Sequence, residues 1–371
     1  MADTKQAEEQ QQDIQASAAR VTEREAGSED PDEVEIAPPN LAWMKNTLQW
    51  GTRATPTKNG LTLDALNLGV YGDVPDFWDD QTRKPRGAFP VPGVAPLGFE
   101  VREKRELWAD NAAGLYEEAI QRRWAPATDV PWDTIQPLPD DVEAAMCQLC
   151  TELSQYASIE VEVIGGWQQK LSYGFHEVKM FLATQMFDNA RHFEAFRKRA
   201  LSNGGGLGVE NKGEVNRMLL ESTGGWPETV AMLHMLRGAY TFTLYRYGEL
   251  YAHNPAEKVL FARCMQDKAR HLAYGLSHLR YATSHNPDKV IVFGRLMGIA
   301  ERVFERELND PVQREALAII FGGGIEGARS GMRQYERMMG DFARLYLANM
   351  EHIGVPREAS FPQGLAKFME A

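Results

Sequence analysis

The sequence of 371 residues is poor in cysteine, in long apolar runs and in positive charge. Its three cysteines are too few for a disulfide framework, which favours a reducing, cytoplasmic location. No stretch approaches the roughly 20 apolar residues that cross a membrane, and the N-terminus lacks the pattern of a signal peptide. A net charge of -12 argues against nucleic acid as a partner, because phosphate binding requires a basic patch.

Two short motifs carry little functional weight. Cys147 and Cys150 form a CxxC inside a helical pattern, without a second Cys or His pair at zinc-finger spacing, so they are expected in the core. Gly322, Gly324 and Gly327 satisfy GxGxxG, but the strand and the βαβ unit of a dinucleotide site are missing. This glycine cluster therefore predicts a helix break.

Composition divides the chain into four regions. Residues 1–38 are acidic and nearly free of aromatic side chains, which predicts a disordered tail. Residues 39–100 form an irregular arm whose aromatic side chains are expected to anchor it on its own bundle or on another subunit. These are Trp43, Trp50, Tyr71, Phe77, Trp78, Phe89 and Phe99. Residues 101–355 form a helical domain, and 356–371 a C-terminal tail.

From about residue 101 the apolar positions recur with the helical period. The pattern predicts helices over 102–124, 140–171, 174–202, 211–222, 227–252, 255–284, 287–308, 311–321 and 325–352. Pro227 and Pro311 suit first-turn positions, and Asn254 suits an N-cap. Alternating apolar and polar residues are absent, so we expect an all-α fold.

A repeat at an offset of 79 residues is the most informative feature. Met186–His192 and Met265–His271 both read M-x-D-x-A-R-H, and both fall in the middle of a predicted helix. The preceding helix of the first half has Glu160 within its apolar stripe. A carboxylate on a core face is costly unless it is paired. Glu160 precedes Asn189 by 29 residues, and two antiparallel helices joined by a short loop would bring the two to one level.

These segments resemble the ferritin-like superfamily, in the branch of bacterial multicomponent monooxygenases and ribonucleotide reductase small subunits. The resemblance implies an all-α, ferritin-like helical bundle. Members of this branch hold two irons with one Glu from each of two helices and a Glu-x-x-His from each of two others. Their motif often reads Asp-Glu-x-Arg-His.

Carried over position by position, the resemblance implies a degenerate site. Glu160 matches the Glu of the first single helix, and His192 and His271 match the two ligand histidines. Asn189 and Lys268 stand where the motif has Glu, and the stretch around Gly238 offers no carboxylate at the second single-helix position. Asp188 and Asp267 match the Asp that orients a ligand His. Three of the four carboxylates are therefore missing.

The charges suggest a hypothesis for this site. Lys268 would take the place of the metal and pair with Glu160, while Asp267 would pair with His192 and Asp188 with His271, crossing between the halves. No intact metal site and no bound cofactor are then expected. Arg191 and Arg270 are expected in structural salt bridges, and His234 and His278 as ordinary core histidines.

Three functions remain open from the sequence. The first is a non-catalytic subunit of a diiron-type monooxygenase complex, packed against a homologous catalytic diiron chain in a hetero-oligomer. The second is an oxygen-dependent oxidoreductase in its own right, with iron in a mononuclear or unusual site. The third is a protein that binds an apolar ligand inside the bundle.

Overall fold

The computed structural model describes residues 38–39, 41–45, 51–79, 81–90 and 92–370, in two compact units, Met1–Thr52 and Arg53–Ala371. In the first unit, the 3-10 helix η1 (Leu41–Lys45) exposes Leu41, Trp43 and Met44. The prediction of a disordered tail over 1–38 falls almost entirely outside the described residues, and so does Trp50.

The second unit is helical, as predicted, and its described residues contain only isolated β-bridges in place of strands. Its α-helices are α2 (Leu63–Leu66), α3 (Ala112–Gln121), α4 (Asp140–Gln168), α5 (His176–Ser202), α6 (Glu214–Leu220), α7 (Trp226–Val230), α8 (Ala239–Leu250), α9 (Pro255–His285), α10 (Asp288–Glu307), α11 (Pro311–Gly322), α12 (Ala328–His352) and α13 (Gln363–Ala366). None of the described helices is long and apolar enough to cross a membrane.

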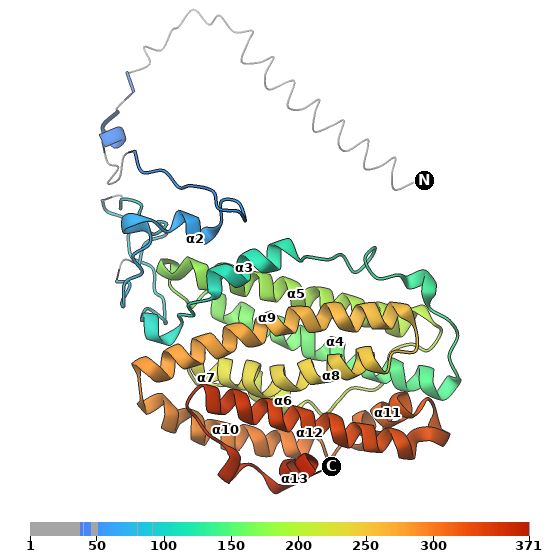
Figure 1. Ribbon diagram of the computed structural model, residues 1–371. Coiled ribbons are helices and arrows are strands. Elements are labelled where there is room, and N and C mark those ends of the chain that lie inside the picture. The colour runs from blue at the N-terminus through green and yellow to red at the C-terminus, as the bar shows by residue number, and fades with distance from the viewer. Residues whose placement is uncertain (1–37, 40, 46–50, 80, 91, 371) are drawn as a thin grey trace, which may run out of the picture. The chain divides into compact units, whose positions relative to one another are not determined.

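Four long helices form the centre of the bundle. α4 packs on α5, α8 packs on α9, and α5 contacts α9 between the two pairs. α3 covers α5, while α11 packs on α4 and α12 packs on α8, so that the last helices form a layer over one side of the bundle (Figure 1). This arrangement places the middle of α5 and the middle of α9 against each other in the interior.

The ends of the helices follow the predicted signals. Pro227 lies in the first turn of α7, and Asn254 and Glu257 form a capping box at the start of α9. The glycine cluster ends α11, where Gly323 at φ 71° provides the left-handed residue that closes the helix. The GxGxxG sequence is therefore a helix break, as predicted.

The helix predicted over 102–124 is wrong in its first half, because α3 begins only at Ala112. Before it lies a single 3-10 turn, η3 (Lys104–Glu106). The backbone around it bonds to the arm instead: Trp78 N donates to Arg102 O at 2.9 Å, and Lys104 N donates to Asp76 O at 2.8 Å. These long-range hydrogen bonds replace those that a helix would have made.

The described arm residues from Arg53 onward pack on the chain's own bundle. The guanidinium of Arg86 donates to Gly174 O at 2.8 Å and to Glu177 Oε2 at 3.0 Å, and both Arg86 and Glu177 are buried. Trp78 lies so close to Gly174 that a Cβ there would be 2.3 Å from the indole ring. Of the two surfaces left open by the sequence, this part of the arm therefore uses its own bundle.

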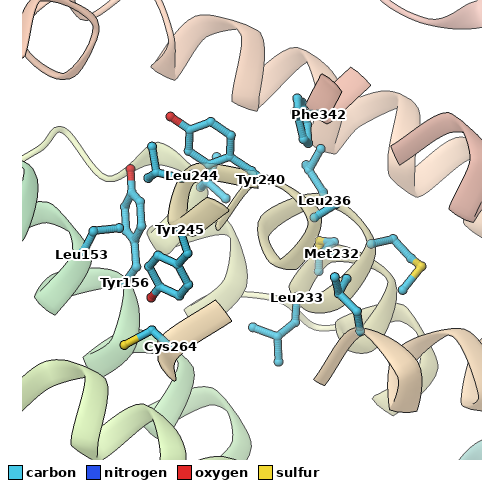
Figure 2. Packing of buried hydrophobic residues seen from close by; sticks show 14 of the residues in the cluster. Leu153, Tyr156, Met232, Leu233, Leu236, Tyr240, Leu244, Tyr245, Cys264 and Phe342 are labelled. Atoms are coloured by element: carbon cyan, nitrogen blue, oxygen red, sulfur yellow. The ribbon is translucent and has the colours of Figure 1, made fainter. Parts of the chain in front are cut away.

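A π-helix interrupts the segment predicted as one regular helix over 227–252. It spans Ala231–Gly238, between α7 and α8, and all eight residues are buried. Figure 2 shows Met232, Leu233 and Leu236 of this π-helix within the apolar core that also contains Tyr245 of α8 and Cys264 of α9. π-Helical turns are rare and often accompany functional sites, and nothing in the apolar pattern distinguishes them from α-helix.

A buried polar cluster lies between α4 and α11. The carboxylate of Glu152, 1% exposed, accepts hydrogen bonds from Gln148 Nε2 at 2.9 Å and Gln313 Nε2 at 2.5 Å. Burial and the negative charge of Glu307 raise the pKa of Glu152 to about 7. The folded protein therefore disfavours the ionised form of Glu152 at neutral pH.

This shift predicts a pH dependence of stability. The pKa of Glu152 is higher in the folded than in the unfolded chain. The contribution of this carboxyl to the free energy of unfolding is therefore fully present below pH 4.5 and is lost as the pH rises through 7. Between pH 4.5 and 8, the free energy of unfolding measured in urea should fall by up to about 3 kcal/mol in the wild type. The Glu152→Gln variant should not show this fall. Parallel curves for the two proteins would contradict the assignment.

Candidate functional site

The two repeated motifs meet in the middle of the bundle. α5 carries Asp188, Asn189 and His192, and α9 carries Asp267, Lys268 and His271. None of these six residues is more than 2% exposed. The structure therefore brings together all the motif positions singled out from the sequence.

The histidines and aspartates pair across the two halves, as the sequence-based hypothesis predicted. His192 Nε2 lies 3.1 Å from Asp267 Oδ2, and His271 Nε2 lies 3.1 Å from Asp188 Oδ2. A carboxylate can only accept, so each imidazole donates from Nε2. Burial and the charge of Lys268 hold the pKa of His271 well below its usual value, which keeps that imidazole neutral.

Two arginines balance the charge of the two aspartates. Arg191 lies 3.1 Å from Asp267 Oδ2 and also pairs with Asp188, while Arg270 lies 3.2 Å from Asp188 Oδ2 and also pairs with Asp267. This confirms their predicted structural role. Although burial favours a neutral Asp267, the hydrogen bond from His192 and both guanidinium groups hold its pKa below the usual range. Two negative and two positive charges thus lie together out of water.

Trp124 is a member of this cluster that the sequence analysis missed. Its indole Nε1 donates to Asp267 Oδ2 at 2.9 Å, and its carbonyl accepts from Arg191 at 3.0 Å. Its ring lies 5.1 Å from the Arg191 guanidinium. Trp124 comes just after α3, at the end of the helix predicted over 102–124 and outside the repeat, and nothing in that pattern indicates a contact with the motifs.

Lys268 and Glu160 form a buried ion pair at the centre of the site. The ammonium donates to Glu160 Oε2, and its Nζ lies 3.4 Å from Asn189 Oδ1. Both charged side chains are no more than 3% exposed. The predicted pairing is therefore present, with Asn189 as a third partner.

Gly238 lies at the end of the π-helix and brings no polar side chain to the site. A Cβ at Gly238 would lie 3.2 Å from Leu233 O and 3.4 Å from Leu272 Cδ2, so the packing there is tight. The π-helix instead presents His234, whose Nε2 accepts from Gln185 Nε2 at 2.8 Å. Burial and the neighbouring His271 and Lys268 keep the pKa of His234 well below its usual value.

His234 and His278 are core histidines, as predicted. His278 Nδ1 donates to Trp108 O at 3.0 Å, and its ring stacks on Tyr274 at a centroid distance of 5.8 Å. The cysteines Cys147, Cys150 and Cys264 are all buried and free. Burial raises the pKa of Cys147 to about 11, so this thiol stays protonated and behaves as a core residue.

The side chains around Lys268 do not fit a pair of metal ions. In the part of the chain that the structure describes, no three His, Cys, Asp or Glu side chains are placed to hold a metal ion. Glu160 Oε1, His192 Nδ1 and His271 Nδ1 are buried without a hydrogen-bond partner, but the ammonium of Lys268 is bound to the same Glu160. Repulsion between an ammonium and a divalent ion a few Å apart costs several kcal/mol at an effective dielectric near 20.

Comparison with known proteins gives a match in structure but not in sequence. No protein-family model and no curated protein matches the chain. A solved R2-like ligand-binding oxidase variant with an aerobically reconstituted Mn/Fe cofactor matches at a TM-score of 0.52 and 17% identity, over 64% of this chain and 92% of that chain. Another variant, with an anaerobically reconstituted Mn/Fe cofactor, has a TM-score of 0.42, 14% identity and the same coverage.

The comparison corrects one expectation and confirms another. The expectation of a chain without a bound cofactor is wrong as it stands, because the solved oxidase with this fold carries a Mn/Fe cofactor. The predicted fold is confirmed. The chain has an all-α, ferritin-like helical bundle fold, similar to that of the solved R2-like oxidase.

Proposed function

We propose that this chain is a non-catalytic subunit of a diiron-type monooxygenase or oxidoreductase complex and packs against a homologous catalytic chain. The observation that carries the proposal is the buried pair of Lys268 and Glu160 between the two histidine motifs. At this level of the bundle a catalytic chain would need carboxylates, and Asn189, Lys268 and Gly238 provide none. Oxygen chemistry in the complex is then assigned to the partner.

The charge balance of the cluster supports this role. Asp188, Asp267, Arg191 and Arg270 neutralise one another, and Lys268 neutralises Glu160. A buried charge stabilises a fold only when it is paired and hydrogen-bonded, and here each carboxylate has a cationic partner. The site therefore works as a polar core that fixes the register of α5 against α9.

Apolar surface for a partner is present on the second unit. Phe77 is 49% exposed and Phe89 is 42% exposed on the arm, while Ile291 of α10 is 58% exposed. Such side chains on a soluble chain are typical of protein–protein contacts when they gather on one face. In the proposed complex, the homologous chain would cover side chains of this kind.

The test is purification of the tagged full-length chain from its native source under mild conditions, followed by native mass spectrometry. We expect a stoichiometric complex with a homologous chain that contains two complete Glu-x-x-His motifs. Oxygen uptake by this complex with a chemical electron donor should survive His271→Gln in the present chain. A monodisperse monomer or homodimer, without the homologous chain, would rule the proposal out.

The alternative is an oxygen-dependent oxidoreductase in its own right, with a mononuclear or unusual metal site. The buried, unpartnered atoms Glu160 Oε1, His192 Nδ1 and His271 Nδ1 favour it, since oxygen and imidazole nitrogen are metal-ligating atoms. This function requires Lys268 to move away from Glu160. Oxygen uptake by the isolated chain that is lost on His192→Ala and on His271→Ala would support it over the subunit role.

A further inference from the structure

The outward-facing side of α5 carries a seam of exposed side chains at alternating spacings of four and three residues. The members of this α5 seam are Ala183, Phe187, Ala190, Glu194, Arg197 and Leu201, all of them exposed. Phe187 is 58% exposed and Leu201 is 53% exposed. The same spacing occurs at the a and d positions along which one helix packs on another in a coiled coil. In the described part of the chain, the seam is left without a partner helix.

A groove of ≈ 560 Å³ lies beside the C-terminal half of the seam, between α5 and the loop that precedes α4. Phe193, Arg197 and Leu201 line it from α5, and Trp132 lines it from the loop. The indole Nε1 of Trp132 donates to Pro126 O at 2.7 Å, so its polar atom is already hydrogen-bonded. The seam is therefore bordered by apolar side chains that an approaching helix would bury.

Two charged side chains lie in the middle of the seam. Glu194 pairs with Lys198 one turn away along α5, in a pair whose side chains are 48% and 38% exposed. Exposed pairs of this kind contribute little, so Glu194 remains able to bind a second cation. Arg197 forms no ion pair with an acidic side chain among the described residues. The seam therefore presents a carboxylate and, three residues later, a guanidinium that lacks a counter-charge.

We propose that the α5 seam binds the α5 seam of a second copy of this chain, in antiparallel orientation about a two-fold axis. Such an interface is isologous, so each contact between two different residues occurs twice. With the axis between positions 195 and 196, Glu194 meets Arg197 of the second copy. In the layer beyond it, Leu201 meets Ala190 of the second copy, so that a large side chain faces a small one.

Other arrangements of two seams are less complementary. A parallel pair would place Glu194 beside Glu194 of the second copy, and Arg197 beside Arg197, so that like charges meet. An antiparallel pair shifted by one heptad would place Arg197 against Phe187 or against Leu201, and would bury the guanidinium without a carboxylate. The charges therefore select one register. The contact goes beyond the proposed function, because it requires only this chain and no homologous partner.

Sedimentation velocity of the purified full-length chain tests the contact, and the wild type is expected to form a dimer. Arg197→Glu and Glu194→Arg should each weaken dimerisation by about tenfold or more, because each places like charges in the central layers. Glu194→Arg combined with Arg197→Glu restores opposite charges and should recover the dimer. Arg217→Glu, in an exposed pair of α6, should leave dimerisation unchanged. A monomeric wild type, or a dimer that Arg197→Glu does not weaken, would overturn the proposal.

An engineered disulfide tests the register. The native cysteines are buried, so introduced thiols on the seam would be the exposed ones. Ala190→Cys combined with Leu201→Cys should link two copies when oxidised with copper phenanthroline. Ala190→Cys alone should not, because the two copies of this residue would lie about 16 Å apart along the helices, too far for a disulfide. Efficient linking by Ala190→Cys alone would overturn the antiparallel register.

Discussion

Replacing Lys268 with methionine is expected to lower the free energy of unfolding by about 3–5 kcal/mol, because it leaves Glu160 buried without its cation. Glu160 and Lys268 are each 2% exposed, so water cannot replace the missing partner. Urea unfolding at pH 8 gives the loss directly.

Two comparisons test the assignment of this loss to the buried pair. Lys170→Met removes a pair with Glu100 in which both side chains are largely exposed, and should cost less than 1 kcal/mol. Lys268→Met combined with Glu160→Gln removes both charges and should be more stable than Lys268→Met alone. If Lys268→Met cost no more than Lys170→Met, the ion pair would not be the element that stabilises the centre of the bundle.

Replacing Arg199 with methionine is expected to have an effect of similar size, about 3–5 kcal/mol or more. Arg199 is fully buried and donates to Glu143 Oε1 at 2.7 Å, to Glu143 Oε2 at 2.8 Å and to Glu257 Oε1 at 2.6 Å. Its removal leaves two buried carboxylates without a cation. Glu257 also belongs to the capping box of α9, so the loss extends to the start of that helix.

Arg217 provides the matched control for this substitution. It pairs with Glu221 at 2.9 Å, but the two side chains are 77% and 61% exposed. Arg217→Met should therefore change the free energy of unfolding by less than 1 kcal/mol. Equal effects of the two arginine substitutions in urea unfolding would show that burial does not determine the cost of losing the pair.

The fold could be predicted from the sequence to the extent that its helices are long and amphipathic. The predicted ranges 140–171, 174–202 and 255–284 correspond to α4, α5 and α9 within a few residues. The cross-pairing of the motifs could also be predicted, because a repeated Asp and His on two facing helices leaves each acid opposite the histidine of the other copy.

The features that were missed depend on contacts between distant segments. The first half of the helix predicted over 102–124 does not form, because its backbone makes hydrogen bonds with the arm around Trp78 instead. Trp124 contacts the cluster through its indole N–H, its carbonyl and its ring, all across distant parts of the chain. The π-helix at Ala231–Gly238 changes the helical register without changing the apolar pattern. None of these leaves a local signal in the sequence.

The crossed pairs make the two halves of the bundle dependent on each other. Asp188 of α5 pairs with His271 and Arg270 of α9. Asp267 of α9 pairs with His192 and Arg191 of α5. A fragment that ended after α5 would therefore contain Asp188 without the histidine and the arginine that α9 provides. Folding of the two halves should therefore be strongly cooperative.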